Sequence, residues 1–326
     1  MPHPSAPNAP HTHSLHLQLL SGDMGNTTMP AARDPPPGTH GITQTYKLKV
    51  NMCIATLNIN GATTLTHNLN LGGKWAYINN VMRTKRITIL ALQETHLDND
   101  LLEDINRNYD KSLEIYNSPI PDHKQNSEGV TSILQRALIA PEKIQTHVLW
   151  PGRALMIKLS WASLKEITIL NIYILTTRSQ HKDFWEHIEQ ERQRKRLPKP
   201  DFILGNFNMM EDAIDREPAS ENESAATDAL RNVRLAWGIQ DQWRHDNPNE
   251  RAFTHHHIRE GSYKFVRLGR IYTKRNLVNC LFEWKIHEPT APTDHSLVSV
   301  KFAPKDSPLI GKDAGHAQLR QWRMTT

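Results

Sequence analysis

The sequence predicts a layered α/β domain in which one β-sheet packs on another, and two kinds of segment support this prediction. Between residues 46 and 304, short runs rich in β-branched residues recur. Several are apolar at consecutive positions, as expected for strands covered on both faces. Segments with apolar residues at helical spacing lie between some of these runs. Many strands with interspersed helices are typical of a domain built from packed layers.

The predicted elements follow one another along the chain. The apolar runs predict strands at residues 52–59, 87–93, 129–135, 154–159, 167–175, 202–205, 265–272 and 295–302. Residues 74–86 and 225–238 have apolar side chains at helical spacing and predict two helices. Gly238 is a typical stop at the C-terminus of the second helix. The sequence contains no internal repeat.

The composition suggests how the chain is divided. Its 326 residues allow one large domain, and eight of its 20 prolines lie before residue 45. This proline-rich start has too few apolar residues to offset the entropy cost of ordering, so residues 1–45 are expected to be a disordered leader. We expect a folded domain at residues 46–304 and a tail or linker at 305–326. No run of 18 apolar residues occurs, so no membrane span is expected.

Charge and cysteine content narrow the class of protein. The net charge of +5 and the pI near 9.1 are compatible with a polyanionic partner but do not require one. The basic run at residues 191–200 could contact a nucleic-acid backbone or be a solvated helix end. Cys53 and Cys280 are too few for a disulfide framework or a cysteine zinc site, which favours a reducing, intracellular compartment.

Polar side chains lie at the ends of several predicted strands. They are Asn58, Glu94, Tyr173, Asn206, Asn208, Asp294 and His295. A carboxylate among amides, with a tyrosine and an Asp-His pair, suits one Mg²⁺ ion and one phosphate. Mg²⁺ takes one or two carboxylates and keeps several waters, while amides and a phenol bind phosphate oxygens without repelling them.

Each of these residues also has a simpler explanation when taken alone. Glu94 could be a solvated residue at a strand end, Asn58 a turn former, and Tyr173 a core tyrosine. Asp294 and His295 could simply cap the following strand. The segment "THHHIREG" (254–261) suggests a metal site. However, three consecutive histidines cannot all face one ion from an extended segment, so a loop near phosphate or in solvent is expected.

Seven motifs occur in a definite order: "TLNINGA", "LALQETH", "GVTSILQRAL", "LNIYI", "ILGNFNMMEDAIDR", "FVRLGRIY" and "TDHSLVSVKFAP". Together they resemble the endonuclease/exonuclease/phosphatase superfamily. Within it, the chain looks most like the apurinic-type endonuclease domain of LINE-type (non-LTR) retrotransposons, and "DAIDR" and the ending look like fungal elements. The resemblance covers residues 48–311. It implies a DNase I-like fold, a four-layer α/β sandwich with two packed β-sheets flanked by helices, and a pocket at one rim.

The resemblance also implies a cofactor, a partner and the residues that contact them. The metal-binding glutamate of the family falls on Glu94, with Asn58 beside it, and the implied ion is Mg²⁺. The phosphate-contacting tyrosine falls on Tyr173. The implied partner is the phosphate backbone of DNA, which leaves the nucleus as one candidate compartment.

Catalytic roles fall on the two remaining motifs. The "GDFN" motif of the family falls on residues 205–208, which places Asn206 and Asn208 in the site. The closing "SDH" motif falls on residues 293–295 and implies catalytic roles for Asp294 and His295.

Two departures from the family pattern affect chemistry. Asn206 replaces the catalytic aspartate of "GDFN", and Gly269 replaces the aspartate of "SRLDRIY" that orients the catalytic histidine. An amide cannot accept a proton at pH 7. Losing a general base typically costs about 10²–10⁴ in rate, and losing the partner of a catalytic histidine can cost about 10⁴. A third, milder departure is "NIYIL" for "NIYAP" after Tyr173.

Three functions follow. The first is an Mg²⁺-dependent endonuclease that nicks DNA, with activity weak or lost because of Asn206 and Gly269. The alternative is an inactive retroelement-derived fragment that retains the fold and weak DNA binding, which the lack of a reverse-transcriptase segment favours. A phosphatase acting on a small phosphoester is a more distant alternative.

Overall fold

The computed structural model describes residues 48–310, except residues 50, 62–72, 119–127, 140–143, 161–165, 220–223, 260, 289–292, 306 and 308. The described residues belong to one compact unit, Thr45–Thr326. The predicted leader and most of the predicted tail lie outside the described residues, so the domain boundaries stay predictions. None of the helices in this part of the chain has the length and apolar character needed to cross a membrane.

Two six-stranded mixed sheets form the centre of the domain. The first has the order β15 (Leu281–His287), β16 (Leu297–Phe302), β2 (Met52–Asn58), β3 (Ile89–Gln93), β5 (Val130–Gln135), β4 (Leu113–Asn117). The second has the order β11 (Ile239–Gln240), β14 (Gly269–Lys274), β9 (Phe202–Asn206), β8 (Ile167–Tyr173), β7 (Ala154–Leu159), β6 (Ile144–Trp150). One neighbouring pair in each sheet is parallel, β2 with β3 and β8 with β9.

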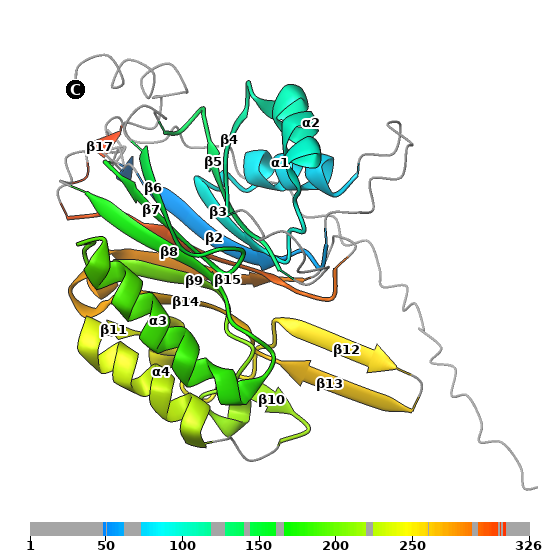
Figure 1. Cartoon of the computed structure of the whole chain (residues 1–326), viewed down its shortest axis with the longest axis vertical. Helices are drawn as coiled ribbons and strands as arrows, with labels where there is room; N and C mark the ends of the chain where they lie inside the picture. The colour runs from blue at the N-terminus through cyan, green and yellow to red at the C-terminus, as the bar shows by residue number, and fades with distance from the viewer. Residues whose placement is uncertain are drawn as a thin grey trace, which may run out of the picture. The chain divides into compact units, whose positions relative to one another are not determined.

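Helices cover the outer faces of the two sheets (Figure 1). Helices α1 (Lys74–Thr84) and α2 (Asn99–Tyr109) lie on the first sheet, and α3 (His181–Arg194) and α4 (Ser224–Trp237) lie on the second. In α3 the buried side chains recur at helical spacing and form one apolar stripe: His181, Phe184, Trp185 and Ile188. A short helix, α5 (Gln242–Asp246), follows β11.

The core consists of three apolar layers, because each sheet is buried on both faces. In β2, Ile54 packs between the two sheets, whereas Ala55 and Leu57 pack toward α1 and α2. In β9, Phe202 packs between the sheets and Ile203 packs toward α3 and α4. Burial on both faces explains why these strands are apolar at consecutive positions. The predicted four-layer sandwich with two packed sheets is therefore confirmed.

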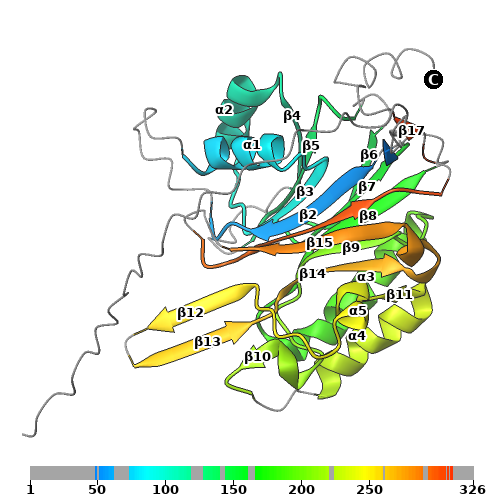
Figure 2. The same cartoon turned by 180° about the vertical axis from the view of Figure 1, so that it is seen from behind.

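Smaller sheets complete the domain. Strands β12 (His255–Arg259) and β13 (Ser262–Val266) form a hairpin, with β10 (Arg216–Glu217) beside β13. Figure 2 shows this hairpin extending away from the two large sheets. Strands β1 (Leu48–Lys49) and β17 (Leu309–Ile310) pair antiparallel, which places β17 within the segment expected to be a tail.

Two local predictions are wrong. Residues 265–272 do not form one strand, because the chain leaves β13 after Val266 and enters β14 at Gly269. Between them Arg267 turns inward, and its guanidinium donates to Asp215 at 2.7 and 3.0 Å and to Asp241 at 2.6 Å. The histidine run is also not a loop. It starts β12, because it pairs in register with β13.

Candidate functional site

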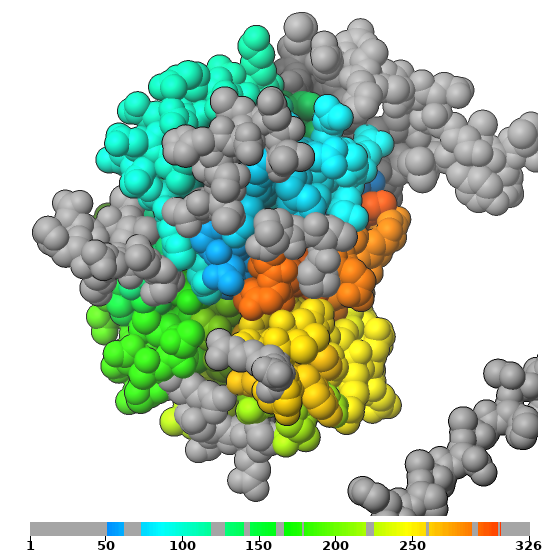
Figure 3. All heavy atoms as spheres, turned by 90° about the vertical axis from the view of Figure 1, so that its right-hand side faces the viewer, coloured from blue at the N-terminus to red at the C-terminus, as the bar shows by residue number. Residues whose placement is uncertain are grey.

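A pocket of about 350 Å³ lies where strand ends from both large sheets meet the base of the hairpin. In Figure 3, the blue end of β2, the orange segment before β16 and the yellow hairpin gather on one face. The pocket is lined by Asn60, Glu94, Thr176, Asn206, Asn208, Met209, Met210, His255, Lys264, Val266, Leu268, Asp294 and His295. Five of the seven site residues expected from sequence therefore share one cavity.

The other two expected residues lie directly behind the pocket wall. Asn58 is 3% exposed, and its Nδ2 donates to Glu94 Oε1 at 2.7 Å, while its Oδ1 accepts the backbone N–H of Asn60 at 2.9 Å. The parallel pairing of β2 with β3 brings the two strand ends together. Asn58 is thus placed as the partner that orients the Glu94 carboxylate. Whether it also contacts an ion directly stays a prediction.

Tyr173 supports the same carboxylate from the second sheet. Its side chain is 4% exposed, and its hydroxyl forms side-chain hydrogen bonds with Glu94 and Asn208. Burial, and then the charge of Glu94, raises the pKa of Tyr173 far above its usual value, so the phenol stays protonated. The guanidinium of Arg153 lies over the ring, 5.6 Å from its centroid.

The backbone of the pocket wall is strained at three lining residues. Asn60, Glu94 and Asn208 have φ angles of 47°, 51° and 48°, in the left-handed region that side-chain-bearing residues rarely adopt. Such strain costs on the order of 1 kcal/mol per residue and concentrates at functional sites. It is held in place by local hydrogen bonds, since the Glu94 carbonyl accepts the N–H of Gly61 at 2.7 Å.

A buried ammonium group lies behind the same wall. Lys74 Nζ donates to three consecutive carbonyl oxygens, those of Ile59, Asn60 and Gly61, at 2.6, 3.1 and 2.6 Å. Burial lowers the pKa of Lys74, while the charges of Asp294 and Glu94 act in the opposite direction. Lys74 therefore holds the loop after β2 in position near the two carboxylates.

The two positions that depart from the family pattern are direct neighbours. In the antiparallel pairing of β9 with β14, Asn206 lies opposite Gly269. Asn206 Oδ1 accepts the N–H of Asn208 at 3.1 Å, and Asn208 Nδ2 donates to the carbonyl of Ile174 at 2.7 Å. A Cβ added at Gly269 would come no closer than 3.4 Å to another heavy atom, Oγ1 of Thr254. The site therefore has space for a side chain at residue 269.

Asp294 and His295 meet a histidine that was not selected from sequence. The ring of His295 is 7% exposed, and its centroid lies 4.6 Å from that of His255 in β12. Burial, and then the charge of His255, lowers the pKa of His295 to about 3, so this ring is neutral at pH 7. A hydrogen bond from His255 lowers the pKa of Asp294 to about 2, so the carboxylate is ionised. The alternation of a strand could have placed His255 and His257 on one face and His256 on the other, but it could not have identified the partners of His255.

Several side chains of the basic run already have partners within the protein. Arg192 and Arg194 are paired with Glu189 and Glu191 along the same helix, and Lys195 Nζ donates to the carbonyl of Val148 at 2.7 Å. Helix α3 ends at Arg194, in agreement with a solvated helix end.

The arrangement offers groups that suit a divalent ion and a phosphate. Glu94 and Asp294 are the carboxylates among the described residues that line the pocket. Two carboxylates with room for water match the ligand preference of Mg²⁺. Neutral His295 and the amide of Asn208 can donate hydrogen bonds to phosphate oxygens. Residues 206 and 269 supply no proton acceptor.

Comparisons with known proteins support this fold. No family model matches the chain. It is 26% identical over 253 residues to the Transposon TX1 uncharacterized 149 kDa protein of Xenopus laevis, covering 77% of this chain but 18% of that protein. The chain thus spans less than a fifth of the length of this curated relative.

Three solved structures have similar folds. The AP endonuclease LMAP from Leishmania major superposes with a TM-score of 0.63 at 14% identity, covering 78% of this chain and 88% of that chain. The endonuclease domain of TRAS1, a telomere-specific non-LTR retrotransposon, superposes with a TM-score of 0.55 at 14% identity, covering 78% of this chain and 99% of that chain. The 3' phosphatase NExo from Neisseria, bound to product DNA hairpin, superposes with a TM-score of 0.58 at 19% identity, covering 78% of this chain and 100% of that chain. At these identities the likeness shows the fold.

Proposed function

We propose that this domain binds the phosphate backbone of DNA at the pocket with the help of Mg²⁺, and hydrolyses the phosphodiester bond only slowly. The pairing of Asn206 with Gly269 is the observation that carries this proposal. Asn206 lines the pocket and Gly269 is its cross-strand neighbour, and neither carries a group that can accept a proton or orient His295. Binding groups are present on the opposite wall, around Glu94.

The donor set fits the proposed ion. The Glu94 carboxylate faces the pocket and is oriented by Asn58 and Tyr173, and Asp294 adds a second carboxylate to the same cavity. Mg²⁺ requires few protein ligands because it retains several waters. When bound, the ion would neutralise phosphate charge and polarise a phosphoryl oxygen.

The chain's own residues account for the remaining contacts. Asn208 is a neutral donor that lines the pocket, so it can orient a phosphate without repelling it, while the protonated phenol of Tyr173 supports Glu94 from behind the wall. His295 is neutral and can donate a hydrogen bond to developing negative charge. Water activation is the step without a dedicated residue, and we expect it to limit the rate.

A DNA-binding domain of retroelement origin without any turnover is the second candidate. The same Asn206–Gly269 pair supports it, and the match to a transposon protein supports the origin. A phosphatase acting on a small phosphoester is a third candidate, since one structural neighbour is a 3' phosphatase.

A plasmid-nicking assay with and without Mg²⁺, paired with DNA binding by fluorescence anisotropy, tests the proposal. We expect binding to duplex DNA that weakens steeply with salt, as for contacts to several phosphates, and Mg²⁺-dependent nicking just above background. Glu94→Ala should remove the residual nicking, and Arg107→Ala, a surface change on α2, is the matched control. Undetectable binding at low salt would exclude DNA as the partner. Brisk nicking would show that hydrolysis does not need the two missing carboxylates.

A further inference from the structure

We propose that His255, Asp294 and His295 form a binding site for a transition-metal ion such as Zn²⁺, which shares Asp294 with the donor set proposed for Mg²⁺ but does not include Glu94. The site goes beyond the proposed function, because it depends on neither DNA binding nor hydrolysis. It joins the start of the hairpin to the segment that leads into β16.

Backbone pairing fixes the two histidines on one face. An isolated β-bridge pairs His255 with His295. The N–H of His256 donates to the carbonyl of Asp294 and the N–H of Ser296 donates to the carbonyl of Thr254, both at 2.9 Å. Directly opposed residues in such a pair project to the same side. The rings are therefore brought together by the backbone and do not depend on a loop conformation.

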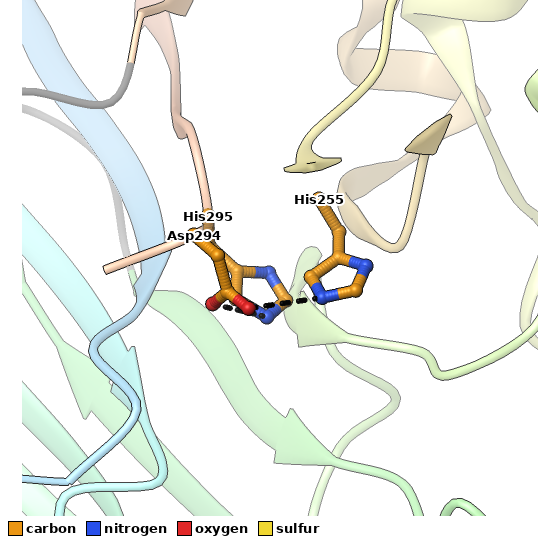
Figure 4. A group of neighbouring side chains, drawn as sticks. All are labelled: His255, Asp294 and His295. Atoms are coloured by element: carbon orange, nitrogen blue, oxygen red, sulfur yellow. Dashed lines mark ion pairs between the residues drawn. The ribbon is translucent and has the colours of Figure 1, made fainter. Parts of the chain in front are cut away.

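The carboxylate of Asp294 approaches a nitrogen of each ring, as the dashed lines in Figure 4 mark. Its Oδ2 is 3.3 Å from His255 Nε2, and its Oδ1 is 3.8 Å from His295 Nε2. One ligand atom from each residue lies within 4.8 Å of the other two. Ligands bound to Zn²⁺ at about 2.0–2.2 Å in a tetrahedron are roughly 3.4 Å apart, so small side-chain rotations close the site.

Two atoms of the cluster are buried without a hydrogen-bond partner among the described residues. They are Oδ1 of Asp294 and Nδ1 of His255. A buried carboxylate oxygen without a partner is costly, and a bound cation would satisfy it. The ring nitrogen that does not bind the ion usually donates to water or to another acceptor.

The ligand types select the class of ion. Two imidazoles and one carboxylate suit Zn²⁺ and other first-row divalent metals, whereas Mg²⁺ prefers oxygen ligands alone. All three residues line the pocket of about 350 Å³, which leaves room for water or a phosphate oxygen as a further ligand.

Cobalt binding to the metal-free full-length chain tests the proposal, because Co²⁺ reports its coordination by visible absorption. We expect one Co²⁺ per chain, displaced by one equivalent of Zn²⁺ and retained in excess Mg²⁺. His255→Asn should weaken binding by about 100-fold or more, since changes in the outer shell alone cost 10–100-fold. His256→Gln is the matched control, because that ring packs against Phe265 on the other face of β12, with ring centroids 5.4 Å apart.

Further measurements separate this site from the Mg²⁺ position. Glu94→Gln should leave Co²⁺ affinity unchanged. If the Glu94→Gln variant lost Co²⁺ binding, the ion would lie at Glu94 and the proposal would be overturned. Unchanged affinity in His255→Asn would overturn it as well. Should His255→Asn fail to fold by circular dichroism, proton NMR of the unmodified Co²⁺ form decides the question. Shifted signals from two coordinated imidazoles are expected, and the absence of either ring would refute the assignment.

Discussion

Restoring carboxylates at residues 206 and 269 should recover hydrolysis only when both are present. The two positions are direct cross-strand partners, so their Cβ atoms in the variant would lie about 4.5–5.5 Å apart. Gly269 is not among the glycines with positive φ, and a new Cβ there meets its nearest atom at 3.4 Å. The backbone therefore accommodates Gly269→Asp without the strain that a left-handed glycine position would impose.

The proximity of the two carboxylates sets the size of the effect. Two charges about 5 Å apart at an effective dielectric constant of about 20 repel each other by roughly 3 kcal/mol. That energy raises the pKa of one carboxyl by about 2 units, toward neutral pH. A general base is most effective when its pKa lies near the working pH, so the pair should raise the nicking rate by about 10²-fold or more. Asn206→Asp alone leaves His295 without an orienting carboxylate, and Gly269→Asp alone leaves water without a base.

The assay is nicking of supercoiled plasmid in Mg²⁺ from pH 5 to 9, together with urea unfolding. The double variant should lose activity as pH falls through the raised pKa. Its stability relative to the unmodified chain should recover over the same range, because the repulsion exists only when both groups are ionised. Adding Glu94→Ala should abolish the gain. The reasoning is refuted if a folded double variant gains nothing, or if the unmodified chain nicks briskly and His295→Ala stops it.

Three further outcomes are expected. Arg267→Met should lower the free energy of unfolding in urea by about 3–5 kcal/mol, because it leaves buried Asp241 without its guanidinium partner and removes two hydrogen bonds from buried Asp215, whereas Arg107→Ala in an exposed pair should cost less than about 1 kcal/mol. The folded pKa of His295, about 3, lies below its unfolded value near 6.5. The contribution of His295 to stability should thus be full above pH 6.5 and be lost as pH drops toward 3. His295→Gln should make the loss of stability with falling pH shallower. The contribution of His287, whose pKa burial lowers to about 4, should remain. Replacing Arg192, Arg194 and Lys195 with glutamine should change DNA affinity less than about two-fold at physiological salt, since these side chains already have partners within the protein.

The sequence predicted the strands that are buried on both faces and missed those that are not. Strands β2 and β9 are apolar at consecutive positions, and their periodicity identifies them. Strands β6 and β15 lie at the edges of the two sheets and contain exposed and half-buried residues. Their sequences therefore lack the consecutive apolar residues that would identify them. The stripe of α3 was also missed, because its four residues are set among ten other residues, all of them polar.

The candidate site was predictable to the extent that its residues follow a motif. Glu94 and His295 stand at positions that the resemblance specifies, and the structure places both at one pocket. His255 could not be found this way, because its position depends on a bridge to a residue 40 positions later in the chain. The pairing of Asn206 with Gly269 likewise depends on the register of two strands that are distant in sequence.

The two walls of the pocket separate binding from hydrolysis. The wall around Glu94 keeps strained backbone at φ 51°, a hydrogen bond from Asn58 and support from Tyr173, all of which hold the carboxylate toward the cavity. Strain of this kind persists only where the surrounding contacts over-determine it. The wall around residues 206 and 269 has no ionisable side chain at these two positions and is nevertheless closely packed, since Asn206 is 1% exposed and accepts a backbone hydrogen bond. We therefore expect that carboxylates can be introduced at residues 206 and 269 without rebuilding the wall that would hold the ion.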